Sequence, residues 1–135
     1  MCYNDFKGKK ALNCKVTIIS SSADFDSRVS SEGLIDFLPD GYEVTYSLDG
    51  DFCTLTVTDN TVTQKRTGSQ NIFMTFSQGE TTLCEIGMNG FCGGFEILTQ
   101  KLTLTKGKGG IKISLEYISR VDGEKTYLTF IAALV

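Results

Sequence analysis

The chain has 135 residues, of which 41% are hydrophobic and 21% charged, and these values are typical of one globular domain. Its net charge of −3 argues against a nucleic-acid-binding surface, because such surfaces carry an excess of Lys and Arg that displaces counterions from phosphates. Histidine is absent, which excludes Ser–His and Cys–His nucleophile pairs and argues against zinc and iron sites. We therefore expect no cofactor, and an enzyme is the least favoured function.

The N-terminal segment, residues 1–12, is predicted to be a flexible tail, and residues 13–135 to form a single domain. The first residues lack the apolar core of a signal peptide, and no apolar stretch reaches membrane-spanning length. With Met1 as the natural start, we expect a cytoplasmic protein without a membrane span.

Strands are predicted at 13–22 and 27–38, and the stretch 20–31 between them is interpreted as a short helix or a loop. Apolar residues then alternate with polar ones from Tyr42 to Leu48 and again from Cys53 to Val57. The dipeptide Asp49-Gly50 separates these two runs and favours a two-residue hairpin turn. Asp59-Asn60 is a second such turn, and it leads into a strand that carries Val62, Gln64 and Arg66.

Further strands are predicted at 71–77, 81–87 and 94–106. Ile111 to Tyr117 alternates most clearly of all, and Asp122-Gly123 then turns the chain into a last strand, Tyr127 to Val135, that is apolar on both faces. Many short strands joined by tight turns indicate an all-β fold, a single antiparallel up-and-down closed barrel of about eight to ten strands. A Greek-key sandwich is the alternative, but it requires longer crossovers than this chain offers.

Several short motifs occur in an order and at a spacing that resembles the YwiB-like family. They are Glu32-Gly33, Tyr46 in Tyr-Ser-Leu, 63–68 with Arg66-x-Gly68, Phe76-Ser-Gln-Gly79, 94–99 and 110–117. The family consists of small bacterial lipocalin-like (calycin) barrels of unknown function, so the resemblance implies that fold and a cytoplasmic location. It supplies no catalytic or binding residues. The segment 87–94, with Cys92, departs from the tyrosine-bearing stretch expected there.

Five cysteines are present, an odd number without a C-x-x-C spacing, and this pattern favours reduced thiols over a disulfide framework. Glycines at 87, 90 and 93 suggest a phosphate-binding loop, but such loops precede a helix, and a strand is predicted here. A flexible loop or bulge is therefore the favoured interpretation. The glycines between Lys106 and Gly110 are predicted to form a hairpin loop for the same reason.

Arg66 is the residue of most interest, because it follows Val62 and Gln64 on one strand face. If this face points inward, the guanidinium requires a carboxylate partner or an acidic ligand. The alternative is a structural role in which the arginine packs over the core at one end of the barrel. Tyrosines in strands are either cavity-lining residues or ordinary core; they are Tyr42, Tyr46, Tyr117 and Tyr127.

Two functions from different classes follow. In the first, the barrel binds a small apolar or amphipathic molecule in its interior, lined by Tyr42, Tyr46, Arg66, Phe76 and Tyr117. In the second, the barrel has a filled core and is a structural or protein-interaction module, whose partner is another protein or a second copy in a homodimer. Neither function involves a nucleic acid or a metal.

Overall fold

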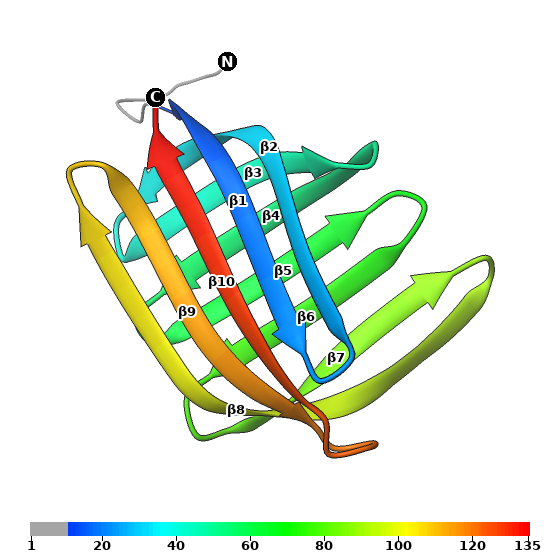
Figure 1. The fold of residues 1–135 in the computed structure, drawn as a ribbon. Helices are drawn as coiled ribbons and strands as arrows, with labels where there is room; N and C mark the ends of the chain where they lie inside the picture. The colour runs from blue at the N-terminus through cyan, green and yellow to red at the C-terminus, as the bar shows by residue number, and fades with distance from the viewer. Residues whose placement is uncertain (1–10) are drawn as a thin grey trace.

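The computed structural model describes residues 11–135, and antiparallel strands account for nearly all of this range (Figure 1). The strands are β1 (Leu12–Ser22), β2 (Phe25–Leu38), β3 (Gly41–Leu48), β4 (Asp51–Thr58), β5 (Thr61–Thr67), β6 (Asn71–Ser77), β7 (Thr81–Met88), β8 (Phe91–Gly107), β9 (Gly110–Ser119) and β10 (Lys125–Leu134). Within the described residues there is no helix that could cross a membrane. The predicted tail, residues 1–12, lies largely outside the described residues.

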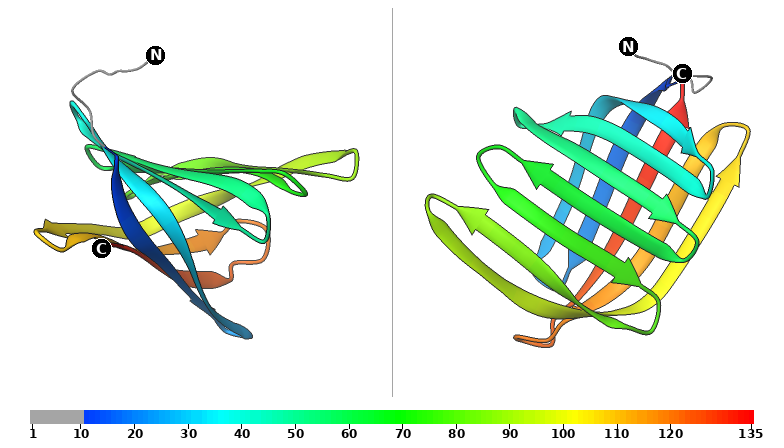
Figure 2. Two further views of the ribbon diagram at one scale, coloured as in Figure 1. Left: turned by 90° about the horizontal axis from the view of Figure 1, so that it is seen from above. Right: turned by 180° about the vertical axis from the view of Figure 1, so that it is seen from behind.

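The ten strands form a closed barrel in which spatial order follows chain order, and β1 pairs with β10 to complete the circle. The register of this last pairing places Cys14 opposite Leu134 and Ser22 opposite Thr126. Seen from behind, β3 to β7 form one side of the barrel, and β1, β10 and β9 cross behind them (Figure 2). The predicted up-and-down closed barrel is confirmed, and the sandwich alternative is wrong.

Two-residue turns set the hairpin registers. Asp49 and Gly50 have φ angles of 52° and 84°, and Asn89 and Gly90 have φ angles of 51° and 79°. Two successive residues with positive φ make a turn whose twist matches that of the flanking strands. Asn and Asp tolerate this conformation better than most residues, and glycine adopts it freely. The turn at Asn89-Gly90 also explains the glycine spacing at 87, 90 and 93, which belongs to a hairpin and not to a phosphate-binding loop.

The stretch 20–31 is neither a helix nor a loop, so this part of the prediction is wrong. β1 continues to Ser22, the chain turns at residues 23–24, and β2 begins at Phe25 directly opposite Ser22. Six serines in this stretch hid the alternation, because small polar side chains suit either face of a strand. Irregular pairing occurs elsewhere: β6 and β7 share only three residue pairs, and β8 has a bulge between Thr99 and Lys101.

The core fills the barrel interior, and inward-facing side chains of all ten strands contribute to it. Two aromatic contacts cross this interior. Tyr46 on β3 lies against Phe130 on β10 with ring centroids 5.6 Å apart, and Phe76 on β6 lies against Tyr117 on β9 at 5.3 Å. Dispersion contacts of this kind, together with apolar burial, stabilise the core.

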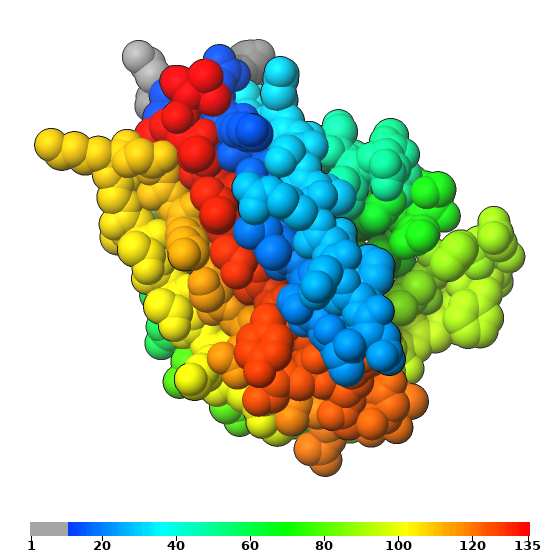
Figure 3. Space-filling model, in the orientation of Figure 1, coloured from blue at the N-terminus to red at the C-terminus, as the bar shows by residue number. Residues whose placement is uncertain are grey.

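The hairpin of β7 and β8 extends beyond the rest of the barrel. Figure 3 shows its tip, in yellow-green, projecting past the hairpin of β1 and β2. Its exposed apolar side chains include Met88, 40% exposed, and Phe91, 66% exposed. The inner face of the β7–β8 hairpin is therefore partly uncovered near the turn 89–90.

Candidate functional site

The five residues predicted to line a site all face the barrel interior, but the structure does not bring them together in one place. Phe76 is 1% exposed and contacts Tyr117, so these two form part of the core. Tyr42 lies beside the turn between β2 and β3. Tyr46 and Arg66 are brought together, because both are register partners of Cys53 in the intervening strand. Tyr127 is 49% exposed and lines no cavity inside the barrel.

Arg66 is the centre of a polar cluster on the inner sheet face, which we call the Arg66 cluster; its other members are Tyr46, Asp51, Gln64 and Ser69. Arg66 donates from Nε to Oδ2 of Asp51 at 2.7 Å. Ser69 donates to the same carboxylate from its backbone N–H at 2.8 Å and from Oγ at 2.9 and 3.1 Å. Gln64 donates from Nε2 to Oη of Tyr46 at 3.3 Å. The Asp51 carboxylate thus has several donors around it.

Two hairpin registers build this cluster. The turn Asp49-Gly50 pairs Leu48 with Asp51, and the turn Asp59-Asn60 pairs Cys53 with Arg66. Asp51 therefore lies diagonally across from Arg66, where long side chains reach one another. Gly68 follows directly after β5 with φ at 149°, and a Cβ there would collide with the Asp51 carboxylate. Glycine at position 68 is what allows the turn residue Ser69 to reach Asp51.

Asp51 and Ser69 were missed in the sequence, although a signal for Asp51 exists. Asp51 begins an inward-facing series that continues with Cys53, Leu55 and Val57, and it is the one charged residue in that series. Combined with the two-residue turns, this position places Asp51 next to Arg66. Ser69 lies in an irregular turn after β5, and no sequence pattern indicates where it points.

The surroundings shift the pKa values of this cluster in opposite directions. The backbone N–H of Ser69, followed by Arg66, lowers the pKa of Asp51 to about 2, because both donors stabilise the ionised form. Burial is the main cause that raises the pKa of Tyr46, and the neighbouring Cys53 adds to it. Burial also raises the pKa of the Cys53 thiol. At neutral pH the cluster therefore holds an ionised Asp51 beside a neutral Tyr46 phenol and a neutral Cys53 thiol.

Most of the hydrogen-bonding capacity of Arg66 is unused. A guanidinium has five N–H donors, and within residues 11–135 only the one on Nε forms a hydrogen bond. The side chain is 16% exposed, so it is largely buried without being closed off. Two terminal amino groups held in this way offer the planar fork that binds a carboxylate or phosphate with two parallel hydrogen bonds.

Arg66 lies towards the barrel end that carries the turns 23–24, 49–50, 68–70, 89–90 and 120–122, which we call the Arg66 mouth. Apolar side chains of the inner face are only partly buried here; they include Ile18, Leu48, Ile72, Ile86 and Leu128. Ile72 and Ile86 continue the cross-strand row that begins with Tyr46, Cys53 and Arg66. Strands β5 to β8 line a hollow of about 440 Å³ whose walls include Arg66, Ile72 and Ile86 but also the outward-facing Lys65, Phe73 and Glu85.

The opposite barrel end, the Tyr42 mouth, carries the turns 39–40, 59–60, 78–79 and 108–109. Lys106 lies over the ring of Tyr42 with Nζ 5.5 Å from its centroid, and Phe37 meets the same ring edge-on at 5.5 Å. Hollows of about 260 and 360 Å³ are both lined by Phe37, Tyr42 and Lys106. This mouth is thus partly closed by a cation–π contact.

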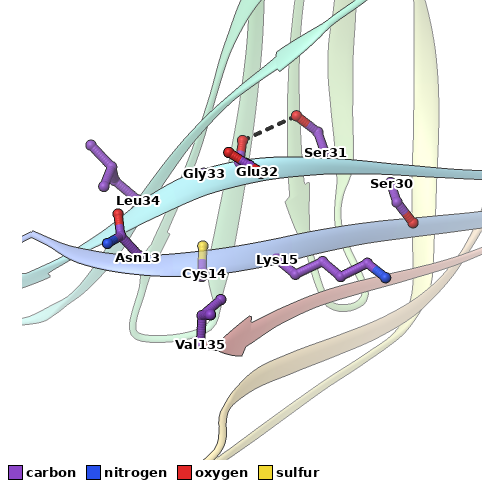
Figure 4. A pocket seen from close by; sticks show the side chains of 9 residues that line it. All are labelled: Asn13, Cys14, Lys15, Ser30, Ser31, Glu32, Gly33, Leu34 and Val135. Atoms are coloured by element: carbon purple, nitrogen blue, oxygen red, sulfur yellow. Dashed lines mark hydrogen bonds between the residues drawn. The ribbon is translucent and has the colours of Figure 1, made fainter.

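A further hollow, of about 810 Å³, is lined by residues of β1 and β2 and by Val135 (Figure 4). Lys15 and Glu32, which are register partners, line it, and the Oγ of Ser31 donates to the Glu32 carbonyl at 3.0 Å. None of the five predicted site residues lines it. Within residues 11–135, no group of three or more His, Cys, Asp or Glu side chains is placed to hold a metal ion.

A family model described as a domain of unknown function, DUF1934, matches residues 42–130 of the chain. The chain belongs to this family. The DUF1934 chain is also similar to a solved structure, the crystal structure of the ywiB protein from Bacillus subtilis. The two share 15% sequence identity with a TM-score of 0.76, and the match covers 96% of this chain and 94% of that one. No curated protein matches the chain.

These comparisons confirm the resemblance to the YwiB-like family. At 15% identity, the likeness between the DUF1934 chain and the ywiB protein shows a shared barrel fold over nearly the whole length. The matched range of the family model includes the Arg66 cluster, from Tyr46 to Ser69. Neither comparison carries an activity, so a function has to be argued from the geometry of the barrel itself.

Proposed function

We propose that the barrel binds a small amphipathic molecule at the Arg66 mouth, with an acidic group of the ligand on the Arg66 guanidinium. The observation that carries this proposal is the unused donor fork of Arg66, largely buried on the inner face of the barrel. Asp51 holds the guanidinium through Nε and leaves both terminal amino groups available. Both amino groups are open to solvent, so an acidic ligand can reach them and form two parallel charge-assisted hydrogen bonds.

The apolar part of the ligand lies against the partly buried side chains beside Arg66, including Ile72 and Ile86. Deeper entry is blocked, because the Tyr46 and Phe130 rings lie in contact and fill the space between β3 and β10. The ligand therefore occupies the mouth and does not pass through the barrel.

In this proposal the protein works in the cytoplasm. Its described cysteines are free thiols, with Cys14, Cys53 and Cys84 buried and Cys92 exposed. Free thiols persist where glutathione and thioredoxin keep them reduced. The Tyr46 phenol and the Cys53 thiol beside Arg66 stay neutral at cytoplasmic pH, so neither adds a negative charge that would repel an acidic ligand.

The aromatic contacts also favour a second candidate, a filled-core module without a ligand. Phe76 and Tyr117 close the interior between β6 and β9, and the core residues around them are almost fully buried. In that case Arg66 and Asp51 form a structural ion pair that ties the turn after β5 to β4. A partner would then bind the outside of the barrel.

Titration with octanoate and with octanol separates the two candidates. We expect octanoate to bind more tightly than octanol, because only octanoate places a carboxylate on Arg66. Replacing Arg66→Gln keeps one amide donor for Asp51 but removes the charge, and should weaken octanoate binding roughly tenfold or more. Isothermal titration calorimetry gives the affinities, and thermal unfolding confirms that the variant is folded.

Arg28→Gln is the matched control, because Arg28 is an exposed arginine on β2. Its removal should leave octanoate affinity unchanged. Equal affinity for octanoate and octanol, or equal losses in the two arginine variants, would contradict the role of Arg66. Absence of binding by either probe, with a stability loss confined to Arg66→Gln, would support the filled-core module.

A further inference from the structure

The first residues of β8 have an unpaired backbone edge. Residues 91–96 pair with β7 on one side, but β9 begins to pair with β8 only at Ile97, opposite Ser119. The last contact on that side is the hydrogen bond from the Arg120 N–H to the Glu96 carbonyl, at 2.9 Å. Beyond it the edge of 91–95 borders no other strand formed by residues 11–135, as Figure 1 shows along the β7–β8 hairpin.

The alternation of an antiparallel ladder tells which groups face this edge. In such a ladder, the N–H and C=O of one residue point to one neighbour, and those of the next residue point to the other. Because the Glu96 carbonyl faces the β9 side, the backbone groups of Gly94 and Cys92 face that side too. Those of Phe91, Gly93 and Phe95 face β7. Cys92 and Gly94 are exposed, so their backbone groups are open to a partner.

The edge lacks the features by which proteins prevent strand pairing. Exposed edges are ordinarily protected by Lys, Pro, inward-pointing charges or a covering loop. The eight residues from Met88 to Phe95 include no charged residue and no proline, although the whole chain is 21% charged. The Phe91 ring lies over Gly93, 3.1 Å from the position a Cβ would take, and yet Phe91 remains 66% exposed.

We propose that this edge pairs with the same edge of a second copy of the chain, antiparallel about a two-fold axis at Gly93. In this register Cys92 lies opposite Gly94 of the second copy, and each such pair exchanges two backbone hydrogen bonds. The two Gly93 residues face each other at the axis, where the absence of side chains permits close approach. Phe91 lies opposite Phe95 of the second copy, which is a stabilising cross-strand aromatic pair.

The distribution of charge is what selects a second copy as the occupant. A two-fold contact brings each residue near its own counterpart, so charges close to the axis repel one another. Here the nearest charged residue of β8, Glu96, is bonded at this edge by Arg120 and so lies outside the paired segment 91–95. A symmetric pairing therefore places no like charges opposite each other, and it satisfies the free groups of Cys92 and Gly94 in both copies at once.

Proline at position 92 provides the first test. Cys92→Pro removes an N–H that forms no hydrogen bond inside the barrel, and edge strands tolerate proline at such positions. Cys92→Ser is the matched control, because it keeps the N–H and changes only the side chain. In sedimentation velocity over a range of concentrations, we expect a dimer for the natural chain and for Cys92→Ser, and loss of the dimer for Cys92→Pro. Circular dichroism checks that the proline variant is folded.

Amide hydrogen exchange on the natural chain tests the register without a substitution. The amides of Cys92 and Gly94 should exchange fast in dilute samples and slowly in concentrated ones, whereas that of Gly93 should be slow in both. In a Cys2→Ser background, a short bismaleimide should join Cys92 to Cys92 of the second copy, because diagonal positions lie roughly 7–8 Å apart. Three outcomes would overturn the proposal: a monomer at all concentrations, an undiminished dimer in Cys92→Pro, or amide exchange at 92 and 94 that does not depend on concentration. A monomer at all concentrations would leave the edge to a different peptide partner.

Discussion

Asp51 shows how one side chain can hold three parts of the chain together. It lies at the start of β4, and its carboxylate accepts hydrogen bonds from Arg66 on β5 and from Ser69 in the turn that follows. A buried ion pair alone gives little stability, because its desolvation offsets its attraction. The backbone N–H and hydroxyl of Ser69 supply the additional hydrogen bonds that such a pair requires.

The lowered pKa of Asp51 predicts a pH dependence of stability. Its pKa in the folded chain is about 2, below the value of about 3.9 for an aspartate in an unfolded chain. The folded state therefore binds the proton less readily, and the stabilisation is complete above about pH 4 and lost as the pH falls towards 2. We expect the urea midpoint to fall over this window in the natural chain and to fall less in Asp51→Asn.

Asp24→Asn, in the exposed turn after β1, controls for the loss of one negative charge. Its urea midpoint should follow that of the natural chain between pH 4 and pH 2. If Asp51→Asn follows the natural chain just as closely, the hydrogen bonds to Asp51 contribute nothing to stability in this range.

At the same scale, the sequence predicted two of the five members of the Arg66 cluster, Tyr46 and Arg66. Alternation put Arg66 on one strand face with Val62 and Gln64, and if that face points inward the guanidinium requires a carboxylate partner or an acidic ligand. Asp51 was identifiable as that partner, because two-residue turns fix the registers of the β3–β4 and β4–β5 hairpins. Ser69 was not identifiable, since an irregular turn has no periodicity that would predict its direction.

At the scale of elements, Gly33 governs how closely β2 and β3 approach. A Cβ at this position would lie 2.5 Å from the Thr45 carbonyl oxygen and 3.0 Å from Cγ2 of Val16. The Thr45 oxygen belongs to the backbone, so it cannot rotate away as a flexible side chain would. Gly33 thus allows β1, β2 and β3 to curve tightly where the sheet turns from one side of the barrel to the other.

Gly33→Ala should therefore destabilise the barrel by about 1–3 kcal/mol, the usual cost of overpacking. Gly107→Ala is the matched control, because Gly107 lies at the end of β8 with no heavy atom within 4 Å of the position a Cβ would take. Urea unfolding of both variants measures the difference. Equal free energies of unfolding in the two variants would show that β2 and β3 can separate at little cost.

Element boundaries were predictable where hydrophobic alternation is strong, as from Ile111 to Tyr117. They were not predictable between residues 20 and 31, where serine predominates and the β1–β2 hairpin forms because its neighbours pair with it. The bulge after Thr99 was not predictable either. It bends β8 between its pairing with β7 and its pairing with β9, and only the positions of those two strands require it. Such features follow from tertiary pairing and have no local signature.

At the scale of the whole molecule, the degree to which the interior is filled decides between the two proposed functions. Phe76 is 1% exposed and packs against Tyr117, whereas Phe52 on β4 is 57% exposed on the outer face. Phe76→Ala should destabilise the barrel by about 3–5 kcal/mol, because the cavity it leaves cannot collapse fully. Phe52→Ala should change the free energy of unfolding by no more than about 0.5 kcal/mol.

Chemical denaturation of both phenylalanine variants measures these values. If the free energy of unfolding falls no more in Phe76→Ala than in Phe52→Ala, the interior is loosely filled. The ligand would then be able to enter more deeply than the Arg66 mouth. A loss of the expected size would confine any ligand to the mouth.

Pairing between β1 and β10 has a consequence for the timing of folding. Every other strand pair joins neighbours along the chain, so hairpins can form as soon as each turn leaves the ribosome. The pairing of β1 with β10 is different, because it joins the first and the last strand of the barrel. Until β10 emerges, β1 has one unpaired edge and the sheet is an open ribbon of strands. Synthesis of the last strand is therefore the event that converts this ribbon into a barrel.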